Sequence, residues 1–316
     1  MKKLFLAALV FPGLISAQSF PAKPVRIVLP FGPGGVADIT TRALAPKLTE
    51  GLGQQVIVEN KPSAGGVIAA QEVARAEPDG YTLLLITNGN ATSTALYKSL
   101  PYDPVNDFAM ISTVGFFGLA IVTDPKSEVK TVRDIIALAK ASPGKYNIGS
   151  VSVGGTQYLA AALFRSVAGI DMQLIPYKAS PEVFIALKNH DVQVGFEILA
   201  PLLSNIRSGN LRAIAVTGAK RFPGLPDVPT VIESGVPGYD VAAWNGLAAP
   251  AKTPSAVIER LHQEAAKAIA SPEVQKRFTD VGVEGRSSTP AALREFFISE
   301  SRRWTQVVEA AKIPKQ

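Results

Sequence analysis

The chain has 316 residues, no cysteine and a formal net charge of +6. This length accommodates two domains of ordinary size. The lack of cysteine excludes disulfides and thiolate metal ligands, and the scattered Lys and Arg residues form no cluster of the kind that binds nucleic acid.

The N-terminus has the pattern of a secretory signal peptide. Lys2 and Lys3 precede an apolar run over 4–15, and the small residues Ser16 and Ala17 follow. The run is too short to span a bilayer as a helix. We therefore expect an exported, periplasmic protein from which the signal peptide, residues 1–17, is cleaved; a buried N-terminal helix is the alternative.

Strands and helices alternate in the first part of the chain. Apolar runs predict strands at 25–29, 56–59 and 82–87, and helical spacing predicts a helix over 38–50 and another that ends at 71–76. Apolar strands separated by helices are typical of a parallel sheet that is covered on both faces.

The stretch 107–124 (DFAMISTVGFFGLAIVTD) breaks this alternation, because it is apolar throughout and no helix interrupts it. We interpret it as a strand that leaves the first sheet, bends at Gly115 and Gly118, and enters a second sheet. Alternation then resumes, with predicted helices at 132–141, 157–167 and 182–189 and predicted strands at 146–149, 172–175, 192–197 and 211–216.

The Pro/Gly-rich segment 221–239 is typical of a linker or an extended loop. A short strand at 241–248 and three helices follow it. Four helix starts pair a hydroxyl N-cap with proline at the first helical position: Ser180-Pro181, Thr253-Pro254, Ser271-Pro272 and Thr289-Pro290.

The chain thus passes twice between two predicted α/β lobes, near 115–118 and near 239–241. We expect residues 20–116 plus 241–316 to form domain 1 and residues 117–240 to form domain 2. Two connecting strands make a hinge, and closure of two lobes around a ligand is a common use of that arrangement.

Three loops between strands and helices carry the candidate binding residues. Glycine lets a ligand approach the backbone, and unpaired N–H groups at a helix start bind anions. The first loop holds Phe31, Gly32, Gly34, Gly35 and Asp38, the second Thr87, Asn88, Asn90 and Thr92, and the third Ser150, Ser152, Gly154, Gly155 and Thr156. The alternatives are a plain turn with Asp38 neutralising the helix start for the first loop and a solvent-exposed loop for the second.

Two enzyme classes compete with a binding function. Gly32, Gly34 and Ala37 match the dinucleotide pattern G-x-G-x-x-A, with Glu59 at the end of the next strand. However, Pro33 removes an N–H from the phosphate loop, and export places the chain where we expect no nicotinamide pool. We expect no cofactor.

A serine hydrolase is the other enzyme class. Ser152-Val153-Gly154 resembles half of a nucleophile elbow, but Ser150 stands where that motif has glycine. Neither His190 nor His262, the two histidines of the chain, is positioned to serve Ser152. We therefore expect no catalytic activity.

Four further residues are candidates for the cleft. Tyr177, Lys178 and Glu197 stand at or next to the ends of predicted strands, and Trp244 lies close to the second crossing. The alternatives are a surface position for Tyr177 and Lys178, a salt bridge for Glu197 and core packing for Trp244. No His/Asp/Glu cluster has the spacing of a metal site.

The sequence resembles the Bug family, the extracytoplasmic solute receptors of tripartite tricarboxylate transporters. The resemblance extends over the chain after the signal peptide and includes long segments such as PVRIVLPFGPGGVADITTRALAPKL, PDGYTLLLITN, IPYKAS and LRAIAVTGAKRFPGLPDVPTVIESGVPGY. It implies a two-lobed, type II-like periplasmic binding protein that holds a small carboxylate through backbone amides, small side chains and water.

The resemblance also implies binding loops at 31–35, 87–92 and 150–156 and at the Tyr177 segment. The implied partners are the membrane subunits of such a transporter or a sensor protein, and we expect a monomer. Three departures leave the identity of the carboxylate open: Ala91-Thr92 where members often have His-Ala, Tyr158 where they often have histidine, and Phe116-Phe117 in place of more polar residues.

Overall fold

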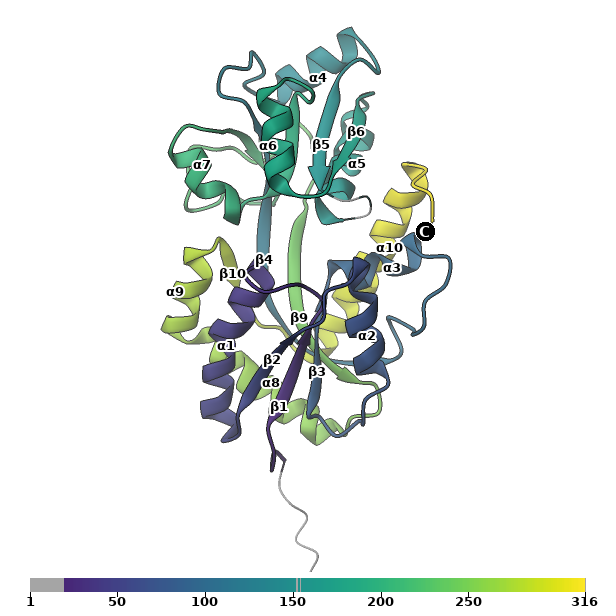
Figure 1. Cartoon of the computed structure of the whole chain (residues 1–316), viewed down its shortest axis with the longest axis vertical. Coiled ribbons are helices and arrows are strands. Elements are labelled where there is room, and N and C mark those ends of the chain that lie inside the picture. Colours follow the sequence, from purple (N-terminus) through teal and green to yellow (C-terminus); the bar gives the residue numbers. More distant parts are fainter. Residues whose placement is uncertain (1–19, 152, 154, 316) are drawn as a thin grey trace, which may run out of the picture.

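A computed structural model describes residues 20–151, 153 and 155–315. The predicted signal peptide, residues 1–17, lies outside these described residues. Figure 1 shows two lobes along the long axis of the molecule, connected by strands β4 (Phe108–Thr123) and β9 (Ala242–Pro250). Within the described ranges, every helix is too short or too polar to span a membrane.

The first lobe contains a sheet with the strand order β2-β1-β3-β9-β4. Strands β1, β2 and β3 are parallel, whereas β9 and β4 are antiparallel to their neighbours. The predicted parallel sheet is therefore extended into a mixed one by the two connecting strands. The other elements of this part of the chain are β1 (Val25–Leu29), α1 (Val36–Leu52), β2 (Val56–Asn60), η1 (Ala64–Gly66), α2 (Val67–Ala74), β3 (Thr82–Thr87) and α3 (Asn88–Leu96).

The second lobe is built around the parallel strands β7-β5-β6, with β4 beside β7 and β8 paired with β4. The predicted strands and helices of this region begin and end within two residues of the observed ones. They are α4 (Val132–Ala141), β5 (Asn147–Val151), α5 (Thr156–Ala168), β6 (Gln173–Tyr177), α6 (Ser180–Lys188), β7 (Val194–Ile198) and β8 (Arg212–Val216). The short helices η2 (Ala200–Leu202) and α7 (Leu203–Arg207), which lie between β7 and β8, were not predicted.

The pairing of β4 changes along its length. Residues up to Gly118 pair with β9, and residues from Leu119 onward pair with β7 and β8. At this point Thr217 joins both connecting strands, because its hydroxyl donates to the Val241 carbonyl at 2.7 Å and accepts from the Leu119 amide at 3.1 Å. Thr217 is fully buried, so these bonds fix the two strands where the chain passes between the lobes.

The C-terminal helices return to the first lobe. They are α8 (Ser255–Ala270), α9 (Pro272–Asp280) and α10 (Pro290–Ala310), with the short strand β10 (Val283–Gly285) before α10. Ser271 and Thr289 cap their helices as predicted. The prediction that Thr253 is an N-cap is wrong, because its hydroxyl donates to the Pro250 carbonyl and Pro254 occupies the cap position.

Candidate ligand-binding site

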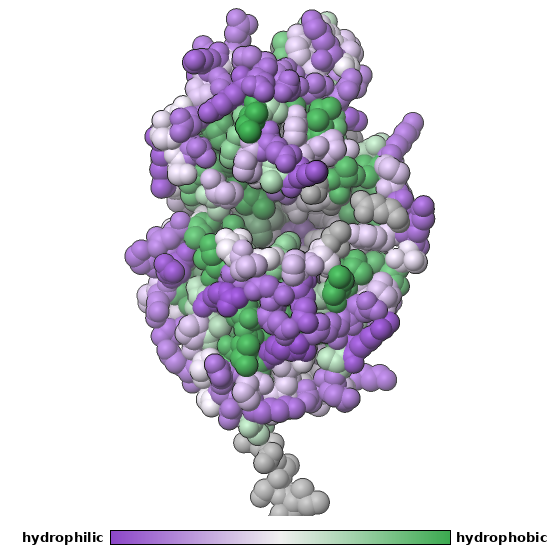
Figure 2. All heavy atoms as spheres, in the orientation of Figure 1, coloured by the Kyte–Doolittle hydropathy of each residue, from purple (hydrophilic) through white to green (hydrophobic). Residues whose placement is uncertain are grey.

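The predicted binding loops follow strands that end at the level of the crossing. Thr87, the last residue of β3, pairs with Asn245, which in turn pairs with Gly115 of β4. From the other side, Ile198 at the end of β7 pairs with Leu119 of β4. Because β1 is parallel to β3, and β5 and β6 run parallel to β7, their carboxyl ends reach the same level. Figure 2 shows the surface hollowed between the two lobes there.

The loop between β1 and α1 is shaped by Asp38. The carboxylate of Asp38 accepts hydrogen bonds from the Gly34 amide at 3.0 Å, from Arg42 Nε at 2.9 Å and from Asn60 Nδ2 at 2.9 Å. Burial raises the pKa of Asp38, but the hydrogen bonds from Gly34, Asn60 and Arg42 and the charge of Arg42 outweigh it and hold this pKa below its ordinary value. Asp38 therefore orders the loop, and the Gly34 amide is already occupied.

The glycines of this loop leave space beside the backbone. Gly34 has a φ of +84°, which a residue with a side chain rarely adopts. No heavy atom lies within 4 Å of the position that a Cβ would take on Gly32, Gly34 or Gly35. Gly35 is the N-cap of α1 and no side chain caps this helix start. The side chain of Phe31 is exposed beside it.

The loop after β3 is the start of helix α3, so the alternative of a solvent-exposed loop is wrong. Thr87, Asn88, Asn90 and Thr92 are all buried. Thr87 and Asn90 form a capping box, and the Thr92 hydroxyl donates to the Gly89 carbonyl at 3.2 Å. Their hydrogen bonds stabilise the start of α3, while the Nδ2 atoms of Asn88 and Asn90 have no partner among the described residues.

Helix α5, like α1, begins at a glycine N-cap. Gly155 is the N-cap of α5, with a φ of −68°, and no side chain caps the helix start within the described residues. Thr156 begins the helix. Ser150 is fully buried, and its hydroxyl has no partner within the described ranges. The candidates Ser152 and Gly154 lie outside the described residues.

The last four candidates differ in their surroundings. Tyr177 is half-buried, and its burial, with the Asp191 and Glu182 carboxylates, raises the pKa of its phenol. Lys178 is exposed and donates its backbone amide to Glu182. Trp244 is 1% exposed, and its ring packs against Phe296 and Phe297 with centroids 5.2 and 6.1 Å apart. The core-packing alternative therefore describes the Trp244 ring.

The Trp244 backbone has a separate role. The amide of Trp244 donates to Oδ1 of the buried Asn88 at 2.7 Å. This bond attaches the start of α3 to the connecting strand β9, so Asn88 is engaged inside the first lobe.

Glu197 is the most unusual side chain of the group. It is fully buried, and its Oε2 accepts a hydrogen bond from the Ser180 hydroxyl at 2.7 Å. Its Oε1 has no partner among the described residues. Burial raises the pKa of this carboxyl to about 7, although the side chains of Ser180 and Gln157 lower it. Among the described residues, Glu197 forms no salt bridge, which was the alternative prediction for this side chain.

Sequence reasoning missed the partners of Glu197. Ser180 was predicted to cap α6, but the cap position is Ala179, and Ser180 is the first helical residue with its hydroxyl on Glu197. Gln157, the second residue of α5, carries no sequence signal for this contact. Asn60, which positions the first loop, stands at the end of β2 and could have been found as a polar residue at the carboxyl end of a strand.

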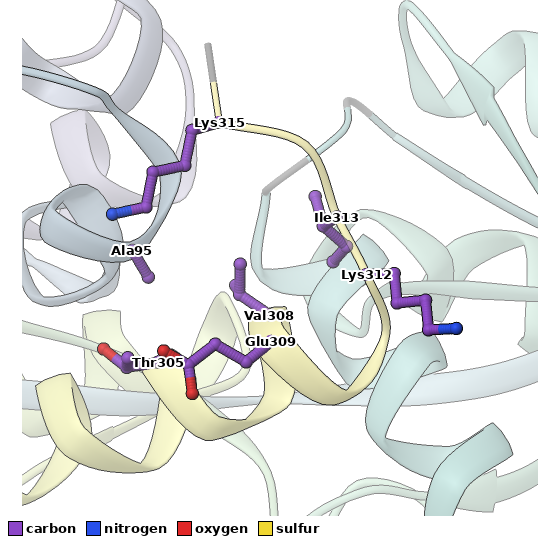
Figure 3. A pocket seen from close by; sticks show the side chains of 7 residues that line it. All are labelled: Ala95, Thr305, Val308, Glu309, Lys312, Ile313 and Lys315. Carbon is purple, nitrogen blue, oxygen red and sulfur yellow. The ribbon is translucent and has the colours of Figure 1, made fainter.

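A surface pocket of about 350 Å³ lies elsewhere, between α3 and the C-terminal end of the chain (Figure 3). In this view Lys315 extends toward α3, where its Nζ donates to the Thr94 carbonyl at 3.3 Å. The pocket is lined by Ala95, Thr305, Val308, Glu309, Lys312, Ile313 and Lys315. None of the predicted binding residues is among them.

Comparisons with known proteins agree with this architecture. Residues 40–313 match the family model described as the tripartite tricarboxylate transporter family receptor. Protein BugT of Bordetella pertussis is 35% identical over 307 residues, which cover 96% of this chain and 94% of that protein. The chain is also similar to the UPF0065 protein in the TAR-I ttuE-ttuC' intergenic region of Agrobacterium vitis, at 35% identity over 98% of this chain and 90% of that protein.

Solved structures extend the comparison. The R. palustris protein Rpa4515 with adipate has a TM-score of 0.82 and 30% identity, and covers 94% of this chain and 100% of that one. The periplasmic binding protein BugD has a TM-score of 0.79 and 32% identity, with coverage of 94% and 100%. MatC from Rhodopseudomonas palustris with bound malate has a TM-score of 0.77 and 28% identity, with coverage of 92% and 100%.

These similarities confirm the predicted fold class, a two-lobed α/β periplasmic binding protein with two crossings. They also confirm the predicted class of function, a solute-binding receptor, and they do not favour an oxidoreductase or a hydrolase. The chain belongs to the family of tripartite tricarboxylate transporter receptors.

Proposed function

We propose that this receptor captures a small carboxylate in the cleft between its lobes and delivers it to the membrane subunits of a tripartite tricarboxylate-type transporter. One observation carries the proposal: α1 and α5 begin at glycine N-caps without a capping side chain among the described residues, one in each lobe. The first N–H groups of such helices have no intrahelical partner and favour an anion.

The same arrangement explains how a carboxylate is held without a dominant cation. Hydrogen bonds from amides to a carboxylate contribute about 1.5–3 kcal/mol each, so two or three of them replace an arginine. The adipate and malate in two of the related structures are of this chemical class. The proposed contacts are the amides of Gly35 and Gly155 and the hydroxyls of Ser150 and Thr156.

The lobes then act as two rigid parts. We assign residues 20–116 plus 241–316 to the first and residues 117–240 to the second, with the hinge at the bonds of Thr217. A ligand that contacts both lobes only in the closed form shifts the equilibrium toward closure. We further propose that the receptor is a periplasmic monomer released from its signal peptide after Ala17; delivery to a sensor protein is the alternative to transport.

A panel of carboxylates tests the proposal. The purified protein, released from co-purified ligand, is screened by thermal shift against adipate, malate, an amino acid and an aromatic carboxylate, with the corresponding amides as controls. A binder at 100 times its Kd adds about 2.7 kcal/mol to the free energy of unfolding. We expect the acids, but not their amides, to stabilise the protein and to give a smaller radius of gyration in solution scattering. Equal stabilisation by the amides would contradict an anion site.

A further inference from the structure

The feature that the proposed function leaves unexplained is a buried acid in a receptor for anions. Glu197 is fully buried, and one of its carboxyl oxygens has no partner among the described residues. The pKa of its carboxyl is set by burial and by two neutral side chains, Ser180 and Gln157. An ionised carboxylate in such surroundings is costly, because no cation of the described part of the chain compensates for the lost water.

The position of Glu197 makes its charge relevant to the ligand. Its partner Ser180 is the first residue of α6, and Gln157 is the second residue of α5. In the sheet, Glu197 pairs with Ala120 of β4, two residues beyond Gly118 at the crossing. The carboxyl therefore lies at the N-terminal ends of α5 and α6, where the positive ends of the helix dipoles are found.

A bound carboxylate and an ionised Glu197 compete for the same positive region. Two carboxylates that share one site do not both ionise readily, and one of them takes up a proton. We propose that capture of an anionic ligand in the cleft is coupled to the uptake of one proton by Glu197, so that the loaded receptor holds this carboxyl neutral. This inference rests on the proposed function, since it requires the anion at the start of α5.

The titratable groups around Glu197 do not account for its pKa shift, so Glu197 itself is the group that responds to the charge of the ligand. Tyr177 and Lys178 are at the end of β6, Glu182 is in the first turn of α6, and Asp191 precedes β7. None of the four is among the causes that shift the pKa of Glu197. Ala120, which pairs with Glu197 on β4, and Ser150 of β5, which pairs with the preceding Phe196, carry no charge. With a pKa of about 7, Glu197 gains or loses its proton near neutral pH.

Calorimetric titration with adipate tests the coupling, with malate as the probe if adipate gives no thermal shift. Carboxylic acids with an ordinary pKa of about 4 are largely ionised above pH 6, so the probe keeps its charge. For the wild type, Kd is expected to rise about tenfold between pH 6 and pH 8, because binding takes up one proton above the pKa of the free carboxyl. Titrations in sulfonate and amine buffers, which differ in heat of ionisation, measure that proton directly.

Three variants separate Glu197 from its surroundings. Glu197→Gln is expected to bind with a Kd that changes less than about twofold over this range and without proton uptake. Ser180→Ala removes a donor that favours the ionised form, so the rise in Kd should move to higher pH. Glu182→Gln is the matched control, because it removes an exposed acid from the same helix end and should retain the wild-type pH dependence.

The outcomes distinguish the inference from the proposed function. If the wild type binds adipate or malate with the same Kd from pH 6 to pH 8, the proton coupling is wrong and the carboxylate site stands. If binding instead becomes tighter as the pH rises, Glu197 acts as an ionised partner for the ligand, and the inference is also overturned. If no carboxylate of the panel binds at any pH, both proposals fail.

Discussion

Replacement of Glu197 by glutamine should change how the stability of the protein depends on pH. Burial raises the pKa of Glu197 in the folded protein from 4.5 to about 7. Between these values the folded state binds more protons than the unfolded state, so the free energy of unfolding falls as the pH rises. The loss is complete above about pH 7, and below pH 4.5 the buried carboxyl has no such cost.

The size of the effect follows from the shift. A difference of about 2.5 pKa units corresponds to about 3 kcal/mol. Glutamine does not titrate and retains a donor and an acceptor near Ser180. Relative to the wild type, Glu197→Gln should therefore gain about 3 kcal/mol between pH 4.5 and pH 7.5. The difference between the two proteins is the relevant quantity, because other carboxyl groups titrate in both.

Urea unfolding, followed by fluorescence of Trp244 and Trp304 and by circular dichroism, measures this difference. The buffers must contain no carboxylate, because acetate or citrate bound at the proposed anion site would stabilise the folded state. Glu182→Gln, at an exposed acid of the same helix, serves as the control for the loss of a carboxylate in this part of the lobe. A difference between Glu197→Gln and wild type that stays constant within about 1 kcal/mol from pH 4.5 to pH 7.5 would refute the argument.

Three other predictions concern the cleft and the hinge. Gly35→Pro deletes one amide donor at a φ of −78° that proline tolerates, so it should weaken carboxylate binding at least about tenfold. The control Gly35→Ala keeps the amide, and its Cβ meets no heavy atom within 4 Å. Equal Kd values for the two variants in calorimetry would argue against the amide contact. Lys178→Ala should weaken binding by less than about tenfold, since Lys178 is the sole cation of the predicted loops; complete loss of binding in the same titration would show that a cation dominates. Thr217→Val should lower the free energy of unfolding by about 1–3 kcal/mol, because it leaves the buried Leu119 amide and Val241 carbonyl without their hydroxyl partner. Thr217→Ser, which keeps a hydroxyl, should retain most of the wild-type stability. A valine variant as stable as the wild type in urea would exclude the proposed role.

Much of the fold could be predicted from the sequence, because the signals are local. The apolar runs at 25–29 and 82–87 became β1 and β3 with the predicted bounds. The long apolar stretch around Gly118 became one strand that pairs on both sides of the crossing, since hydrophobic continuity without a helix leaves a strand as the remaining element. The signals Ser271-Pro272 and Thr289-Pro290 begin helices for equally local reasons.

The roles of the polar residues depended on partners that are distant in sequence. Asn88 was predicted to face a ligand, and its Oδ1 accepts a hydrogen bond from the Trp244 amide, 156 residues away. Ser180 was predicted to cap a helix, but its hydroxyl donates to Glu197 on another element. A polar residue at the end of a strand satisfies its hydrogen bonds with whichever group the fold brings within about 3 Å. The sequence by itself therefore determined which segments end at the crossing between the lobes, and only the tertiary structure decided which of their polar side chains already have a hydrogen-bond partner.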